Sequence, residues 1–216
     1  MKILIIIVIV LLIAIINYLL ITLIVDFIVM GKVSFRVSKT KHKDKFVIKN
    51  KNKIDIQTGF KCSAFASAYL LRHLNIDANG DEIYNMIPHK MKSGYVYPKG
   101  IADLFKEKGF NVCYYSGNLN TLKHDLENSG NPIIVMIRIQ KDKNYLHYVP
   151  VVGFDENNIF IAESLAELVN DNNELYNRKI GNKEFLKLWN TSMLRQPLYK
   201  NTYFVTSTKW YIGIVK

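Results

Sequence analysis

The chemistry available to this sequence depends first on its two cysteines, Cys62 and Cys113. Cys62 follows the turn signal Thr58-Gly59 and begins a segment in which apolar residues recur at helical spacing. A thiol at the start of a helix lies near the positive end of the helix dipole, which lowers its pKa and favours the nucleophilic thiolate. Cys113 instead belongs to the strand-like run 110–115, where we expect a small core residue. We therefore predict Cys62 as a candidate nucleophile, against the alternative that a lone cysteine only fills the core.

A nucleophilic thiolate needs an acid–base partner, and His147 is the best placed of the five histidines. It directly precedes the apolar strand 148–153, and a side chain at a strand start lies at the rim of a sheet, where it can face a helix terminus. An acid that orients His147 must come from an adjacent strand, which favours Glu163 over Asp155, a residue of the hairpin loop. The remaining histidines lie in a basic segment, near a helix end, in a loop and on a surface helix (His42, His73, His89 and His124).

The elements that must position these groups change in type along the chain. Periodicity predicts helices first, and β-branched or aromatic runs bounded by turn residues predict strands later. This order predicts an α+β fold rather than alternating βαβ units. The expected helices cover 62–74, 81–86, 101–108, 119–127 and 183–189; the expected strands cover 110–115, 132–139, 148–154, 159–162, 203–205 and 210–215; a short extended stretch covers 54–60.

Two blocks of sequence, 56–64 and 147–163, resemble the papain-like cysteine peptidases. The specific resemblance is to stand-alone relatives of the domain that trims double-glycine leader peptides from bacteriocins, and it covers roughly residues 54–165. It implies the papain-like cysteine peptidase fold, with N-terminal helices packed on an antiparallel sheet.

The resemblance also implies a role for each residue of the set. Cys62 would be the nucleophile and His147 the general base and acid, while Gln57 would donate an amide hydrogen bond to the oxyanion together with the backbone N–H of Cys62. Glu163 would orient His147, although the family usually has an Asp there, so the extra methylene must be absorbed by a backbone shift. A second departure is Ser63, where the family usually has a glycine.

The N-terminus carries a strong membrane pattern at residues 3–25, which contain no charged side chain. At about 1.5 Å per residue this helix spans ~34 Å, enough to cross a hydrocarbon core of about 30 Å. The run is too long for the apolar core of a cleaved signal peptide, and bulky residues follow it where a cleavage site needs small ones. It is also apolar on every face, unlike a core helix. We therefore predict a retained single-pass anchor at residues 1–31.

The formal charge of +11 is concentrated in residues 32–53, where nine basic side chains face one acid. We expect a juxtamembrane tether there that binds anionic lipid headgroups, with a solvated linker as the alternative. The rest, 54–216, carries only +3 (19 basic minus 16 acidic), so we assign it to one peptidase domain and expect no nucleic-acid partner. The basic flank favours a cytoplasmic domain, whereas the family resemblance allows the outside, because many stand-alone relatives act there.

Three functions fit these residues. The first is hydrolysis of a peptide or protein substrate through a Cys62 thioacyl-enzyme, the second is transfer of the same acyl group to an amine or thiol, and the third is a degenerate peptide-binding module. We expect neither a cofactor nor a metal, because no Cys or His pairs occur at zinc-ligand spacing.

Overall fold

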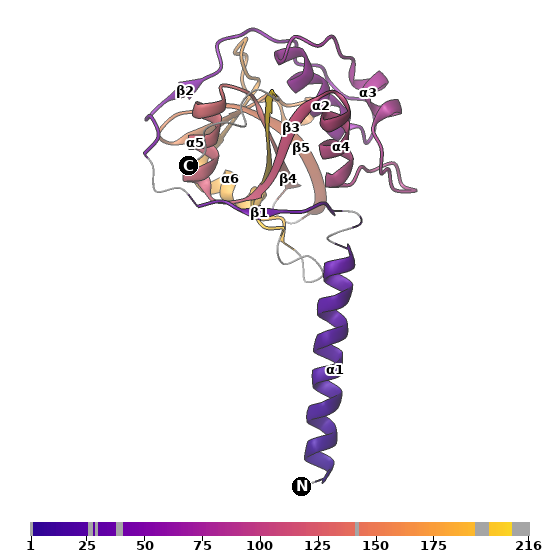
Figure 1. Ribbon diagram of the computed structural model, residues 1–216. Coiled ribbons are helices and arrows are strands. Elements are labelled where there is room, and N and C mark those ends of the chain that lie inside the picture. The colour runs from indigo at the N-terminus through magenta and orange to yellow at the C-terminus, as the bar shows by residue number, and fades with distance from the viewer. Residues whose placement is uncertain are drawn as a thin grey trace.

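A computed structural model describes residues 2–25, 28, 30–37, 41–140, 143–192 and 199–208. One long helix projects from an α+β domain (Figure 1). The elements are α1 (Lys2–Val25), β1 (Ser34–Phe35), β2 (Phe46–Val47), α2 (Cys62–His73), α3 (Gly80–Met86), α4 (Pro98–Glu107), β3 (Phe110–Ser116), α5 (Leu119–Ser129), β4 (Ile133–Gln140), β5 (Lys143–Phe154), β6 (Asn158–Ile161), a 3-10 turn (Ala166–Leu168), β7 (Arg178–Gly181), α6 (Asn182–Trp189) and β8 (Thr202–Thr208). The predicted α+β class and the N-terminal helices are confirmed.

A single sheet organises the domain in the order β1-β3-β8-β4-β5-β6-β7, with β2 paired to β5 outside this path. All pairings are antiparallel except β1 with β3. The alternation of side chains along β4 separates two cores: Ile134 and Met136 pack with α2, α3 and α4, whereas Ile133, Val135 and Ile137 pack with α5 and α6. The sheet is therefore covered by helices on both faces.

Several boundaries differ from the sequence expectations. β5 begins at Lys143 rather than 148, so His147 lies inside the strand, paired with Ile137, and does not open it. α4 begins at Pro98 rather than 101, since proline suits the first helical position. β7 was not expected, and β8 extends the expected strand 203–205 at both ends. The expected strand 210–215 lies outside the described residues.

The prediction that Cys113 is a core residue is wrong, because its side chain is exposed. Successive residues of a strand face opposite ways, and in β3 it is Tyr114 that points into the core, where it stacks on Phe204. The run 110–115 is apolar or aromatic at most positions, so its pattern did not reveal which face is buried.

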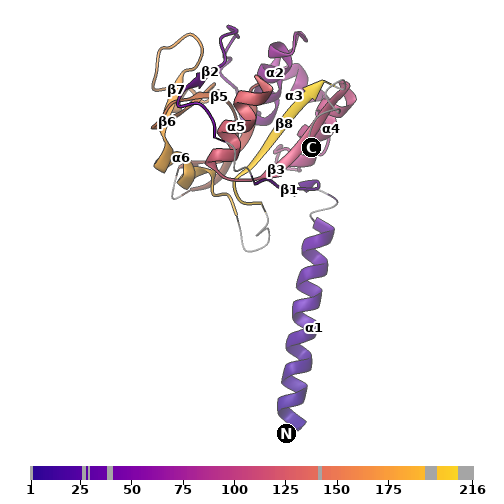
Figure 2. The ribbon, with the colours of Figure 1, turned by 60° about the vertical axis from the view of Figure 1, so that its left-hand side comes forward.

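The basic segment 32–53 follows the surface of the domain over its described parts. β1 pairs with β3, and β2 pairs with β5. β1 lies at the end of the domain next to α1, while β2 lies towards the opposite end (Figures 1 and 2). The charges are partly paired, since Arg36 Nη2 lies 2.9 Å from Asp125 Oδ1 and Lys43 Nζ lies 3.0 Å from Glu127 Oε1. The boundary at residue 54 stays a prediction, and the segment before it contributes two strands to the sheet.

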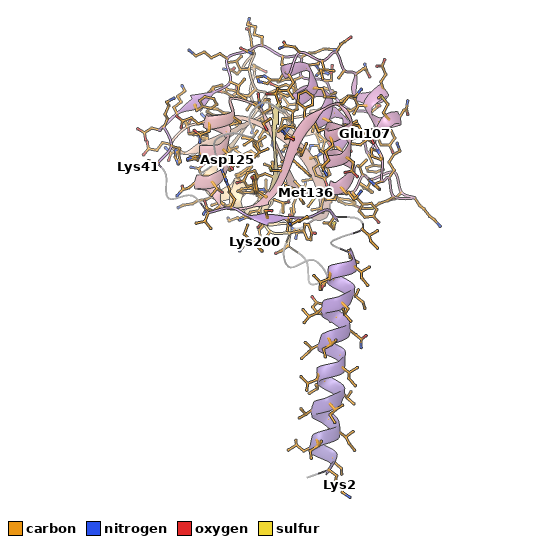
Figure 3. The ribbon with its side chains drawn as sticks, viewed as in Figure 1. Lys2, Lys41, Glu107, Asp125, Met136 and Lys200 are labelled. Carbon is orange, nitrogen blue, oxygen red and sulfur yellow. The ribbon has the colours of Figure 1, made fainter. Side chains whose placement is uncertain are left out.

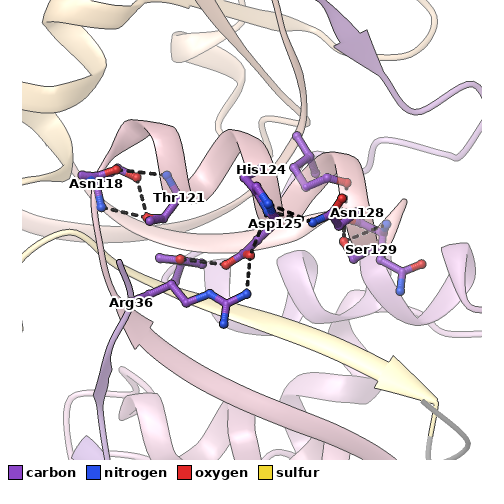
Figure 4. Close-up of polar contacts among 10 residues, drawn as sticks. Arg36, Asn118, Thr121, His124, Asp125, Asn128 and Ser129 are labelled. Atoms are coloured by element: carbon purple, nitrogen blue, oxygen red, sulfur yellow. Dashed lines mark hydrogen bonds and ion pairs between the residues drawn. The ribbon is translucent and has the colours of Figure 1, made fainter. Parts of the chain in front are cut away.

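α5 holds this segment through Asp125. The helix starts with a capping box, in which the Asn118 side chain accepts from the Thr121 N–H and the Thr121 hydroxyl accepts from the Asn118 N–H (Figure 4). One turn on, Asp125 accepts hydrogen bonds from Arg36 and from the Tyr203 hydroxyl. Arg36 is thereby fixed to both α5 and the sheet.

α1 contains no buried residue, and it is the one helix among the described residues that is long and apolar enough to cross a membrane. The end of α1 and the chain after it contact the domain: Val25, the last residue of α1, packs at the edge of the helical core, and Met30 is buried within that core. The Tyr199 hydroxyl donates to the Gly31 carbonyl at 3.1 Å. The end of α1 is thus attached to the domain by packing and by a hydrogen bond.

Candidate active site

The first residue of α2 is Cys62, as predicted. The helix is buried from Cys62 to Leu71, so the sheet and the neighbouring helices fix its position. No acidic side chain occupies the first turn, and Arg72 and His73 lie in the last turn, an arrangement that leaves the helix dipole unopposed at Cys62. Cys62 is only 7% exposed, yet it lines a cleft.

His147 hydrogen-bonds to Cys62 and to Glu163, and its Nε2 lies 2.7 Å from Glu163 Oε1. Burial lowers the pKa of His147, but these two hydrogen bonds and the charge of Glu163 outweigh it and raise the pKa to about 9. Burial likewise raises the pKa of the Cys62 thiol, but the hydrogen bond and charge of His147 bring it below its ordinary value. Both shifts favour the thiolate–imidazolium pair over the neutral thiol and imidazole.

Glu163 is fully buried, and both of its carboxylate oxygens are occupied. Oε1 accepts from His147 and from the Leu165 N–H at 2.8 Å, and Oε2 accepts from Arg178 Nη1 at 2.7 Å. Burial raises the pKa of Glu163, but His147 and Arg178 lower it to about 2. The carboxylate is therefore ionised and held between two cationic partners.

The backbone around Glu163 is also fixed. Asn177 accepts from the Glu163 N–H at 2.6 Å and donates to the Glu163 carbonyl at 2.9 Å. Just before Glu163, the register between β5 and β6 shifts between Val151 and Gly153. An irregularity of this kind is where a chain can accommodate a longer acidic side chain beside His147.

Asp155 lies in the β5–β6 hairpin loop, the alternative position considered for the acid. Its Oδ1 accepts from the backbone N–H groups of Asn157 and Asn158 at 2.9 and 2.7 Å. The carboxylate thus closes the turn, and Glu163 is the acid that reaches His147.

Gln57 is attached to the loop that carries Glu163. Its backbone N–H donates to the Ser164 carbonyl at 2.8 Å, and its side-chain oxygen accepts from the Ser164 hydroxyl at 2.7 Å. The Gln57 amide nitrogen donates to the Gly59 carbonyl at 2.7 Å. The expected role of Gln57 at an oxyanion stays a prediction.

Three supporting residues were not identified from the sequence: Ser164, Asn177 and Arg178. Arg178 lies in the short strand β7, which was not expected, and a lone arginine carries no local signal of its partner. Among the described residues, no group of three or more His, Cys, Asp or Glu side chains could hold a metal ion.

Cys62 and Ser63 lie in a cleft of about 300 Å³ with a mostly apolar lining. The lining side chains come from five separate parts of the chain and include Met30, Met91, Val96, Pro98, Met136 and Leu146. A groove beside a thiolate–imidazolium pair can hold a peptide next to the sulfur.

A family model described as the peptidase C39 family matches residues 50–197, more than half of the chain. The chain belongs to the peptidase C39 family. C39 members are cysteine-type peptidases with a papain-like fold, so the resemblance to double-glycine leader peptidases is confirmed at the level of the family.

Solved structures agree on the C39 fold. The peptidase domain of Streptococcus ComA, a bi-functional ABC transporter involved in quorum sensing, matches with a TM-score of 0.54 at 17% identity over 73% of this chain and 99% of that domain. A C39-like peptidase from Bacillus anthracis matches with a TM-score of 0.55 at 15% identity over 77% of this chain and all of the other (100%). A double-glycine-motif protease from an AMS/PCAT transporter, solved with the leader peptide, gives 0.48 at 12% identity, covering 77% and 100%. No curated protein matches the sequence.

Proposed function

We propose that this C39 family member is a membrane-anchored cysteine peptidase with Cys62 as its nucleophile. The observation that carries the proposal is that His147 is hydrogen-bonded on one side to Cys62 and on the other to the buried carboxylate of Glu163. In this arrangement the sulfur is held as a thiolate and the imidazolium is held ready to donate its proton.

The reaction follows from this pair. The Cys62 thiolate attacks the carbonyl carbon of the scissile peptide bond, and His147 protonates the departing amine, which leaves a thioacyl-enzyme. Water, deprotonated by His147, then attacks the thioester and releases the acid and the thiolate. The backbone N–H of Cys62 and the Gln57 amide, now bonded to Gly59, donate to the oxyanion.

Glu163 and Arg178 act through His147. The carboxylate fixes the ring so that its other nitrogen faces the sulfur, and Arg178 keeps the carboxylate ionised and in place. Glu163 thus contacts His147 at the position where the family usually has an Asp, with both of its oxygens occupied. This arrangement also supports a working site over a degenerate binding module, which needs no such network.

α1 is proposed to be a retained anchor rather than a cleaved signal sequence. The length of the apolar run 3–25 supports this, and cleavage beyond Gly31 would in addition remove Met30, which is buried in the domain, and the hydrogen bond from Tyr199 to Gly31. The basic flank that begins at Lys32 favours the cytoplasmic side for the domain. Protease treatment of intact cells tests the side, since digestion of the domain from outside contradicts the charge argument.

Alkylation of the full-length protein tests the nucleophile. Cys113 is exposed and serves as an internal reference within the same chain. At about pH 6.5, brief treatment with iodoacetamide should modify Cys62 at least about tenfold faster than Cys113, as read by peptide mass spectrometry. His147→Ala should abolish this preference, because the thiol then loses the cation that stabilises its thiolate. Equal and slow labelling of both cysteines in the unaltered chain contradicts the proposal.

Product analysis separates hydrolysis from acyl transfer. With a cleaved peptide and an added amine, the peptidase releases the free acid, whereas a transferase forms the amide. Amide as the main product would replace hydrolysis by transfer and keep the same Cys62 site.

A further inference from the structure

One wall of the active cleft comes from the segment that follows α1. Met30 lines the same cleft as Cys62, although it lies only five residues after Val25, the last residue of α1. Its side chain is 4% exposed and packs in the core formed with α2 and α4. Met30 therefore belongs both to the stretch that follows α1 and to the lining of the cleft.

Met30 is held in this position by its neighbours. Gly31 has a positive φ of 78°, and a Cβ built on it would lie 3.7 Å from the backbone of Lys99, at the start of α4. The Gly31 carbonyl accepts from Tyr199, and Ser34 and Phe35 then pair with β3. These contacts fix the position of the cleft wall relative to the domain.

The distance from α1 to the cleft wall is short. Five residues span at most ~18 Å even when fully extended. The polar region on each side of a bilayer is about 5–8 Å thick, so an α1 that crosses the membrane places Met30 at or just above the headgroups. Met136, a lining residue of the cleft, lies in the half of the domain nearer to α1, and Lys200 lies at that edge (Figure 3).

The side chains around the cleft suit this location. Phe60 is 63% exposed and Tyr145 is 56% exposed, and both border the cleft. The Phe60 ring packs against Tyr95, another lining residue, at a centroid distance of 5.2 Å. Exposed aromatic side chains beside an apolar groove are typical of a surface that binds apolar groups. Close to the lipid headgroups, such groups belong to molecules held in the membrane.

We infer that the substrate is a peptide tethered to the same membrane, cleaved a few residues beyond its own anchor, with a bulky apolar side chain seated against Met30. The inference rests on the proposed function, since it names the substrate class of the Cys62 site. A substrate that approaches freely from solution is the competing outcome.

The test uses the full-length protein in vesicles of phosphatidylcholine and phosphatidylglycerol. The probes are peptide chloromethyl ketones that end in Leu-Gly-Gly, chosen for the double-glycine preference that the family implies, and each carries a two-chain lipid anchor at its N-terminus. Cys62 displaces the chloride and forms a thioether. Flexible spacers of about 5 or about 25 residues separate the anchor from the reactive group. Because the lipid anchor is the same, both probes have the same surface concentration and differ only in reach.

The short-spacer probe should label Cys62 about tenfold faster, because effective concentration falls roughly as the −3/2 power of spacer length. Rates are divided by the amount of Cys62 that a membrane-impermeant maleimide reaches, which corrects for the orientation of the protein. Equal rates for the two spacers, or faster labelling by the long one or by the same peptide without lipid, overturn the inference.

Substitutions at Met30 test the cleft wall. Met30→Trp fills the cleft and should slow the short-spacer probe about tenfold relative to the rate at which iodoacetamide modifies Cys62 in the same variant. Met86→Trp, at an exposed methionine outside the cleft, is the matched control and should change neither rate. If Met30→Trp does not fold, Met30→Ala should still reduce the preference of the cleft for Leu over Ser in the probe.

The two levels of the proposal fail in different ways. If iodoacetamide does not single out Cys62 in the unaltered chain, the peptidase proposal fails and the substrate class fails with it. If iodoacetamide singles out Cys62 but the rate of labelling by the lipid-anchored probes does not depend on spacer length or on Met30→Trp, only the membrane-tethered substrate is rejected.

Discussion

The active site has two sides that are built by different physical means. On one side, His147, Glu163 and Arg178 form a buried chain of charged groups in which each partner has a fixed hydrogen bond. On the other side, Met30 and its apolar neighbours form a wall that depends on shape and volume. Removal of one member of a buried ion network leaves an unpaired charge, whereas an apolar wall tolerates substitutions that conserve volume. The charged side should therefore be intolerant of change and the apolar side adaptable.

The largest effect is expected for Glu163→Gln. The amide keeps the size of the side chain but cannot stabilise an imidazolium, so peptide cleavage should fall by about 10²–10⁴, by analogy with the Asp-to-Asn change of serine protease triads. Glu163→Asp, which keeps the charge but shortens the reach, should lose less. Cleavage of a double-glycine peptide by the two variants measures the difference, and equal activity in Gln and Asp variants would show that the charge is not needed.

The next effect is on stability, at Arg178. Arg178→Met removes the cation that occupies Glu163 Oε2 and should destabilise the fold by about 3–5 kcal/mol, because the carboxylate stays buried. The neighbouring Lys179 is exposed, so Lys179→Met is the matched control and should change stability by about 0.5 kcal/mol or less. Urea unfolding of the two variants decides. A small, equal effect for both would mean that His147 and the Leu165 N–H satisfy Glu163 without Arg178.

The contrast between the two sides also explains what the sequence could reveal. Cys62 and His147 are recognisable because a helix start and an apolar strand give each a local pattern, and the family resemblance adds Gln57 and Glu163. Arg178 and Met30 are not recognisable, because their partners are chosen by the folded chain. Met30 follows an anchor by five residues, and nothing in that stretch points to Cys62.

The sequence also failed to predict where strand β5 begins and which face of strand β3 is buried. β5 begins in the mixed stretch Lys143–Leu146, which lacks the unbroken apolar run of 148–153 but continues the ladder with β4. Cys113 was assigned to the wrong face because residues on both sides of it are apolar or aromatic. In each case cross-strand pairing, which is not local in sequence, decided the outcome.

A smaller effect is expected in acid. The pKa of Glu163 is about 2 in the fold and about 4.3 in an unfolded chain, so its contribution is fully present above about pH 4.3 and is lost as pH falls through 2. That pKa difference corresponds to about 3 kcal/mol in the free energy of unfolding. The measured effect should be smaller, because His147 and Arg178 share the stabilisation of the carboxylate. The unaltered chain should therefore lose more stability between pH 5 and pH 2 than Glu163→Gln does, in denaturant titrations. Parallel loss in both chains would assign acid sensitivity to other carboxylates, such as Asp103 and Asp155, whose pKa values are also lowered.

The smallest effect is expected on the apolar side, for Met30→Leu. The two side chains have similar volume, so the cost in stability should stay below about 1.5 kcal/mol and the short-spacer probe should still be preferred. Met30→Asp places a charge in the same wall, where the apolar lining residues offer it no partner. It should therefore lower the stability and the preference for the short-spacer probe more than Met30→Leu does. If Leu and Asp behave alike, Met30 does not form the wall of the occupied cleft, and the apolar side of the site is not set by shape and volume.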